Sequence, residues 1–293
     1  MRRIDGDQDV QLRGRRVRFN DSGVGSTPLL LLHGCAFDRE QWTALAPGLG
    51  EHYRVVAIDA PGCGGSAADS AQPSFIRAYA EAALDVIAAL ALGRVAIVGH
   101  SFGAAVGVRI ATEHPEFVSR LVLISLLPSR RPRALRERLA GGRVFPNSLV
   151  MRWLRARVLS VHRGPHASAV AEPYATNFLA RLAGAERFDV AANTALRIVD
   201  ELARDRTLDA QLARLRTPTA LIFGRGDPLV RASLAPRLAR EIGARRLDVL
   251  ECEHTPEREL PDAVAQIVEQ FLRDATSAAS TVTARPRFGA TWR

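Results

Sequence analysis

A serine between two glycines stands at a strand-to-helix junction near the middle of the chain. The apolar run at residues 95–98 leads directly into Gly99-His100-Ser101-Phe102-Gly103, and a segment with helical periodicity follows. The glycines permit a sharp turn that raises the serine hydroxyl above the strand, and the new helix offers N–H groups and the positive end of its dipole. A serine held in this way can act as a nucleophile if a base takes its proton. The pentapeptide alone arises by chance in roughly one chain of this length in ten, so its surroundings decide its meaning.

Two further turns precede the serine, and each follows an apolar run. The first is His33-Gly34-Cys35, after residues 29–32, and the second spans residues 59–66 with the sequence Asp-Ala-Pro-Gly-Cys-Gly-Gly-Ser. The N–H of Cys35 can form an oxyanion hole together with the N–H of Phe102. We therefore predict that these two backbone groups bind the negative charge that develops during the reaction.

With these three turns the sequence resembles the α/β-hydrolase superfamily. Members of that superfamily carry His-Gly-x and Asp-x-Pro-Gly-x-Gly-x-Ser ahead of a Gly-x-Ser-x-Gly turn, as this chain does at residues 33–35, 59–66 and 99–103. The resemblance implies an α/β fold, with a mostly parallel central sheet flanked by helices and a helical cap insertion. It gives Asp59 a structural role and not a catalytic one.

The resemblance also implies that an acid and then a histidine follow the serine along the chain. Asp227 lies in the turn after an apolar run, and His254 is the one histidine beyond it, at the start of a His-x4-Glu-x-Pro pattern. Some members place the acid after the preceding strand, but residues 121–128 contain no carboxylate. We expect Ser101 to be the nucleophile, His254 its base and Asp227 the acid that orients the imidazole. Each of them taken alone fits an ordinary turn or loop residue better, and it is their combination in this order that favours a triad.

Several residues near these motifs are candidates for binding the substrate. For His33 the alternative is a hydrogen bond to the loop backbone, and for His100 it is packing or orientation. A metal site is not expected, because a Gly-Pro pair interrupts the one helix-like histidine spacing, at 162 and 166, and no cofactor is implied. The substrate-binding candidates are His33, Gly34, His100, Phe145 and Trp153.

The elements that must position these residues alternate along the chain. Alternation of strands with helices predicts βαβ units and a mostly parallel, helix-covered sheet. Strands are expected at residues 17–20, 29–32, 55–58, 95–98, 121–125, 220–223 and 247–250, and helices at 74–92, 102–114, 229–242 and 261–274. The alternation stops between 128 and 215, where helical patterns are broken by Gly and Pro. We divide the chain into a flexible N-terminus (1–13), a hydrolase core (14–128 and 216–275), a helical cap (129–215) and a flexible C-terminal tail (276–293).

Composition excludes several function classes. The chain has 293 residues, and all 40 of its basic residues are arginine. Without lysine there can be no Walker phosphate loop, pyridoxal Schiff base or kinase-type lysine. Three widely spaced cysteines give no disulfide framework or thiolate zinc site. With no secretory leader and no apolar run long enough for a membrane, we expect a cytoplasmic protein that does not associate with membranes.

The positive charge is concentrated in the expected cap. Ten arginines and one acid, Glu137, lie between residues 130 and 163. Such a patch attracts anions, so an anionic small molecule, or a substrate carried on coenzyme A or an acyl carrier protein, is a candidate partner. A solvated helical face is the alternative. Nucleic acid is not expected, because no aromatic stacking surface accompanies the charge. The oligomeric state is not predicted.

These observations favour a serine-dependent enzyme that cleaves an ester, thioester or related carbonyl compound through an acyl-enzyme. A serine at the turn disfavours the branches of the superfamily that use an aspartate nucleophile, the dehalogenases and epoxide hydrolases. The alternative is a non-hydrolytic tailoring enzyme of secondary metabolism, which uses the same triad for acyl-group elimination, cyclisation or acyl transfer. A third interpretation is a silent ligand-binding scaffold.

Overall fold

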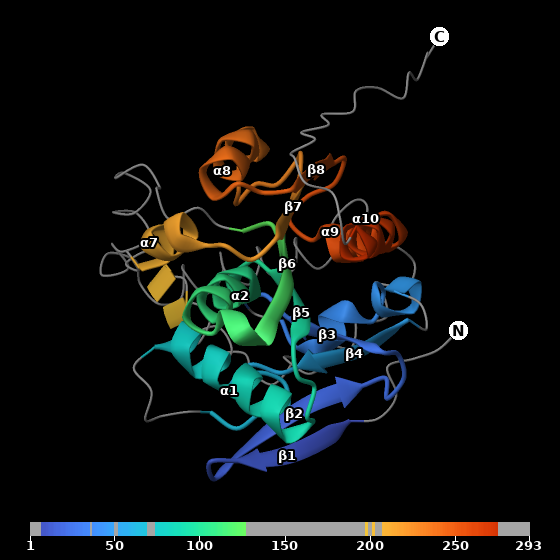
Figure 1. Cartoon of the computed structure of the whole chain (residues 1–293), viewed down its shortest axis with the longest axis vertical. Coiled ribbons are helices and arrows are strands. Elements are labelled where there is room, and N and C mark those ends of the chain that lie inside the picture. Colours follow the sequence, from blue (N-terminus) through green and yellow to red (C-terminus); the bar gives the residue numbers. More distant parts are fainter. Residues whose placement is uncertain are drawn as a thin grey trace, which may run out of the picture.

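The computed structural model describes residues 7–35, 37–49, 52–68, 74–126, 197–198, 201–202 and 207–274. Eight strands form one sheet in the order β1-β2-β4-β3-β5-β6-β7-β8 (Figure 1). β1 and β2 run antiparallel to their neighbours, and β3 to β8 are all parallel. The strands are β1 (Gln8–Leu12), β2 (Arg15–Asp21), β3 (Thr27–Leu32), β4 (Tyr53–Ile58), β5 (Val95–His100), β6 (Val118–Ile124), β7 (Thr219–Gly224) and β8 (Arg246–Leu250).

Helices cover both faces of the sheet, which explains why its central strands are apolar without interruption. Successive side chains of a strand point to opposite faces, and in β3 Leu30 joins one buried cluster while Leu31 joins the other. The first cluster contains residues of α1 (Phe75–Ala89), α2 (Phe102–Glu113), α7 (Thr207–Arg214) and α8 (Ala235–Ile242). The second contains residues of η1 (Arg39–Trp42), η2 (Ala46–Leu49) and α10 (Pro261–Arg273). Figure 1 shows α1 and α2 on one side of the sheet and α10 on the other. The remaining short helices are η3 (Pro115–Phe117), η4 (Ala232–Leu234) and α9 (Pro256–Glu259).

The predicted architecture, a mostly parallel sheet flanked by helices, is confirmed, and three boundaries differ from expectation. Gln8–Leu12 is not part of a flexible terminus, because it forms β1 and pairs along its length with β2. The helix expected at 229–242 starts at Ala235. Residues 228–230 form bends instead, and the single 3₁₀ turn η4 (Ala232–Leu234) precedes the helix.

The third difference concerns the end of the expected cap. Thr207–Arg214 forms α7, which packs against α2 and whose Gln211 donates a hydrogen bond to Glu113 at 3.0 Å. This helix therefore belongs to the layer that covers the sheet. Most of the expected cap, including Phe145, Trp153 and the arginine-rich stretch, lies outside the described residues, as does the C-terminal tail. No helix in the described part is both long and apolar enough to span a membrane.

The topology brings the ends of distant segments together at one edge of the sheet. Ser101 directly follows β5, Asp227 lies three residues beyond β7, and His254 lies four residues beyond β8. Since these strands are parallel and lie in the order β5-β6-β7-β8, their carboxyl ends meet at the same edge. Ligands of open α/β sheets bind at this edge.

Candidate active site

Ser101 occupies a sharply bent connection between β5 and α2. Its backbone angles are φ 50° and ψ −106°, in a region that residues other than glycine rarely adopt. Gly103 allows the turn to lie close to β3, because a Cβ at this position would be 2.1 Å from the carbonyl oxygen of Leu32. The Ser101 N–H donates to the carbonyl of Ile124 in β6 at 2.8 Å. The serine is thus fixed against both neighbouring strands.

The side chains of Ser101, His254 and Asp227 form one hydrogen-bonded chain. His254 Nε2 is 3.2 Å from Ser101 Oγ, and His254 Nδ1 is 2.7 Å from Asp227 Oδ2. A carboxylate accepts only, so the proton on the ring lies at Nδ1 and Nε2 is left as the acceptor for the serine hydroxyl. All three residues are buried, with exposed fractions of 6% or less.

Asp227 and His254 are each held by their own loops. Asp227 Oδ1 accepts the N–H groups of Leu229 and Val230 at 2.7 and 2.9 Å, which leaves Oδ2 for the imidazole. Glu259 performs a similar task around the histidine, because its carboxylate accepts the N–H groups of Glu253 and Thr255 on either side of it. The carboxylate and the imidazole therefore face each other in fixed orientations.

The turn after β3 is arranged so that one peptide group is fixed. The ring of His33 donates from Nδ1 to the carbonyl of Gly34 at 2.8 Å and accepts the N–H of Ala60 at Nε2 at 2.9 Å. Burial lowers the pKa of His33 to about 4, so the ring is neutral, as this pattern requires. The N–H of a trans peptide points opposite to its carbonyl. The Cys35 N–H is therefore directed away from His33, while the N–H of Phe102, the first residue of α2, has no acceptor within its own helix.

Substrate binding by His33, Gly34 and His100 stays a prediction, and the structure shows that these residues bind other parts of the protein. Both nitrogens of the His33 ring are occupied by backbone, and the Gly34 N–H donates to Gln41. His100 is fully buried, donates from Nε2 to the carbonyl of His254 at 2.9 Å and packs edge-on against the His254 ring. Burial keeps the pKa of His100 well below its ordinary value. The rings of His33 and His100 thus contact loop backbone, which is compatible with the alternatives stated for these two residues.

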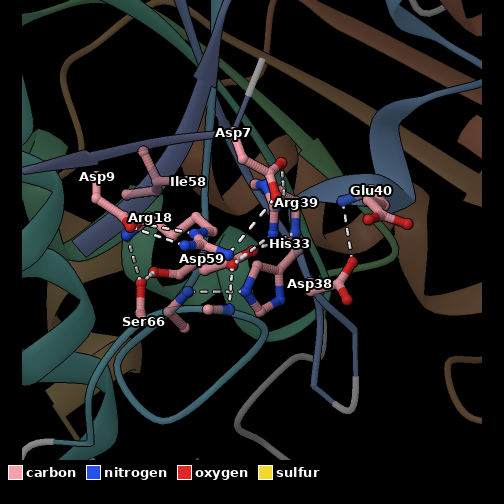
Figure 2. A network of polar contacts seen from close by, with 12 residues as sticks. Asp7, Asp9, Arg18, His33, Asp38, Arg39, Glu40, Ile58, Asp59 and Ser66 are labelled. Atoms are coloured by element: carbon pink, nitrogen blue, oxygen red, sulfur yellow. Dashed lines mark hydrogen bonds and ion pairs between the residues drawn. The ribbon is translucent and has the colours of Figure 1, made fainter. Parts of the chain in front are cut away.

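A buried ion pair anchors the segment beside this turn. Asp59, at the end of β4, accepts the backbone N–H and a guanidinium N–H of Arg39 at 2.7 and 2.8 Å, together with the N–H of Gly65 (Figure 2). Arg39 also pairs with Asp7, just before β1. Because Arg39 begins η1, the network fixes η1 to the sheet. Asp59 has the structural role that the resemblance implied.

Three buried polar residues around the site were not predicted from the sequence. Tyr79 accepts the His33 N–H and donates to the carbonyl of Ile58, and Gln41 and Glu257 bind each other. Tyr79 and Gln41 follow no recognisable motif. Glu257 lies close enough to His254 in sequence that a search for carboxylates near the predicted base would have found it. Among the described residues, no three His, Cys, Asp or Glu side chains come together as ligands for a metal ion.

The arrangement has the components of acyl transfer. The Ser101 hydroxyl lies against an imidazole nitrogen of His254, and the imidazole is oriented by the Asp227 carboxylate. A model of the α/β-hydrolase fold matches residues 27–256, which is most of the chain. The chain belongs to the α/β-hydrolase family.

Individual relatives of this α/β-hydrolase are hydrolases of several kinds. It is 29% identical to a putative carbamate hydrolase, RutD, of Rhizobium rhizogenes, over 75% of this chain and 82% of that protein. It is 39% identical to a fluoroacetate dehalogenase of Burkholderia sp., over 39% of each chain. Among solved structures, a hydrolase of Pseudomonas aeruginosa superposes with a TM-score of 0.72 at 28% identity, covering 92% of this chain and 98% of that one. These comparisons support hydrolase activity.

Proposed function

We propose that this α/β-hydrolase is a serine hydrolase that cleaves an ester, thioester or related carbonyl compound, with Ser101, His254 and Asp227 as its catalytic triad. The observation that carries the proposal is the continuous hydrogen-bonded chain from Ser101 Oγ through the imidazole to the Asp227 carboxylate. Its geometry supports nucleophilic catalysis, because the base is within reach of the hydroxyl proton and is itself oriented by a third group.

The first half of the reaction forms an acyl-enzyme. Ser101 Oγ attacks the substrate carbonyl carbon while its proton passes to His254 Nε2, and Asp227 stabilises the resulting imidazolium. The tetrahedral oxyanion binds the N–H groups of Cys35 and Phe102. The intermediate collapses, His254 returns the proton to the leaving group, and the bond between the carbonyl carbon and that group breaks. In the second half, water attacks the ester carbonyl with His254 again as base, and release of Ser101 yields the acid.

The proposed substrate is a small carbonyl compound. Similarity to the putative carbamate hydrolase makes carbamates part of the range to be tested, with esters and thioesters. The arginine-rich stretch in the sequence at residues 130–163 favours a substrate that is anionic or carried on coenzyme A or an acyl carrier protein.

Labelling with a fluorophosphonate tests the proposed nucleophile. The wild type is expected to gain the mass of one phosphonyl group, located on Ser101, and Ser101→Ala to gain none. The matched control is Ser125→Ala, since Ser125 is another buried serine that follows a neighbouring strand, and this variant is expected to be labelled. An unlabelled wild type would refute the proposal. Turnover in heavy-oxygen water then tests hydrolysis, because the label must enter the acid product.

A further inference from the structure

Gln41 and Glu257 join the turn after β3 to the segment that carries His254. The Gly34 N–H donates to Gln41 Oε1 at 2.9 Å, and Gln41 Nε2 donates to Glu257 Oε1 at 2.5 Å. Gln41 belongs to η1, and Glu257 belongs to α9, three residues after the histidine. The hydrogen bond between Gln41 and Glu257 therefore joins residues that are 216 positions apart in the sequence.

The direction of these bonds is determined by the chemistry of the groups. A backbone N–H can only donate, so the Gln41 atom that faces Gly34 must be its carbonyl oxygen, and its NH₂ group must face Glu257. Glu257 accordingly accepts. Neither side chain can exchange these partners for water, because Gln41 is 1% exposed and Glu257 is not exposed at all.

The hydrogen bonds of Gln41 and Glu257 also affect the orientation of the peptide groups on either side of Gly34. Gly34 joins two peptide groups: its N–H is held by Gln41, and its carbonyl is held by His33, which directs the Cys35 N–H. If the first peptide group is released, the second can rotate with it. A donor must point at the place where the oxyanion forms, and even small displacements of such donors are costly to the rate.

We propose that Gln41 and Glu257 are positioning residues, which hold the turn at Gly34 so that the Cys35 N–H is aligned with the oxyanion and keep this turn in register with His254. A second contact joins α9 to the segment just before η1, because the guanidinium of Arg258 lies over the ring of Phe37 at 5.6 Å. The inference rests on the proposed acyl-enzyme mechanism and deepens it, since it names what aligns the oxyanion hole.

Three substitutions of similar side-chain size distinguish the positioning role of Gln41 and Glu257 from a merely structural role. Gln41→Met removes both hydrogen bonds, and Glu257→Met removes the acceptor that holds Gln41. Glu257→Gln retains a carbonyl oxygen that can accept from Gln41. The matched control is Gln211→Met, because Gln211 is also a buried glutamine bound to a glutamate, Glu113, but it joins α7 to α2.

The assays are hydrolysis of p-nitrophenyl acetate and inhibition by 1,1,1-trifluoro-2-octanone, whose adduct with serine is a hemiketal oxyanion. Active-site concentration is set by fluorophosphonate titration. Gln41→Met and Glu257→Met are expected to lower kcat by about 10-fold or more, with KM changed by no more than about 2-fold, and to raise the inhibition constant of the ketone by a similar factor. Glu257→Gln at pH 7 and Gln211→Met are expected to stay within about 3-fold of wild type in all three constants.

The outcomes test the positioning role of Gln41 and Glu257 separately from the proposed serine hydrolase function. If wild type and Gln41→Met are both labelled at Ser101 and share the same kcat and inhibition constant, the positioning role is refuted and the proposed function stands. Equal losses in Gln41→Met and Gln211→Met would also refute it, because they would show a general effect of buried hydrogen bonds. If the wild type is not labelled, both proposals fail. Should Gln41→Met not fold, the comparison of Glu257→Met with Glu257→Gln gives the same decision.

Discussion

The backbone of Ser101 stores conformational strain that a substitution can release. Its φ of 50° and ψ of −106° are accessible to glycine at little cost, but they place the Cβ of any other residue in conflict with its own backbone. Ser101→Gly should relieve this conflict, whereas Ser101→Ala removes the hydroxyl and keeps the Cβ. Neither variant loses a helix cap, because the serine side chain makes no capping hydrogen bond to α2.

The expected difference in stability between Ser101→Gly and Ser101→Ala is the balance of two opposing free-energy contributions. Strained backbone conformations of this kind cost about 1–3 kcal/mol, and the greater freedom of glycine in the unfolded chain costs roughly 0.5–1 kcal/mol. With about 2 kcal/mol for the first term and about 0.75 kcal/mol for the second, Ser101→Gly should be about 1 kcal/mol more stable than Ser101→Ala. Both lose the hydrogen bond to His254, which therefore cancels in the comparison.

Urea unfolding followed by circular dichroism measures this difference directly. The free energy of unfolding should depend on urea concentration with the same slope in both variants. The difference in stability then appears only in the urea concentration at the midpoint of unfolding. Ala88→Gly is the control for a glycine substitution at an unstrained position. Ala88 is exposed within α1, and its replacement should lower the free energy of unfolding by about 1 kcal/mol. A Ser101→Gly variant that is no more stable than Ser101→Ala would show that the bend is not strained, and the argument would be wrong.

Three more substitutions test the surroundings of the site. Burial raises the pKa of Glu257 from its ordinary 4.5 to about 7. The carboxyl keeps its proton to higher pH in the folded than in the unfolded protein. The free energy of unfolding of the wild type should therefore fall by about 3 kcal/mol relative to Glu257→Gln as the pH rises from 4.5 to 8. Urea titrations at several pH values measure this change. Gly224→Ala would place a Cβ 1.8 Å from the carbonyl oxygen of Glu253, so it should displace the histidine loop and slow fluorophosphonate labelling by about 10-fold or more. Arg39→Met leaves Asp59 buried without its charge partner and should lower the free energy of unfolding by about 3–5 kcal/mol.

Each of these expectations has a matched comparison. A Glu257→Gln protein whose stability follows the wild type at every pH would contradict the buried, protonated carboxyl. Gly226→Ala is the control for Gly224→Ala, because its Cβ would meet its nearest neighbour at an ordinary 3.4 Å, and equal rates of labelling in the two would contradict the steric argument. For the ion pair, Asp59→Asn combined with Arg39→Met should cost less than the sum of the two single changes, and simple additivity would contradict direct coupling.

The turn at Ser101, the apolar strands beside it and the positions of Asp227 and His254 could be predicted from the sequence. The turn at Ser101 was predictable because few residues other than glycine allow the approach seen at Gly103, and the strands beside it are apolar because both faces of the sheet are covered. Chain order then pointed to Asp227 and His254, which the structure brings to hydrogen-bonding distance. Their catalytic roles remain a prediction.

The missed features depend on contacts between residues that are distant in sequence. The pairing of β1 with β2 is not visible in the polar segment Gln8–Leu12, whose residues are mostly exposed. Local patterns also place His33 and His100 beside the reaction, although their side chains turn inward to bind backbone. Gln41 has its hydrogen-bond partner 216 residues away, which no pattern within a short window can report.

The way in which β6 connects to β7 has a consequence for how the protein can change. These strands are parallel neighbours, and α7, packed on α2, provides the crossover that a βαβ unit needs. The chain leaves β6 at the carboxyl edge of the sheet, where the serine lies. Before α7 it contributes Ile198 and Leu202 to the core cluster that contains α1 and α2, and Glu201 accepts the N–H of Phe75 at the start of α1. An exchange of the sequence between β6 and α7 therefore has to retain Ile198, Glu201 and Leu202, because these residues hold the helices that cover the sheet.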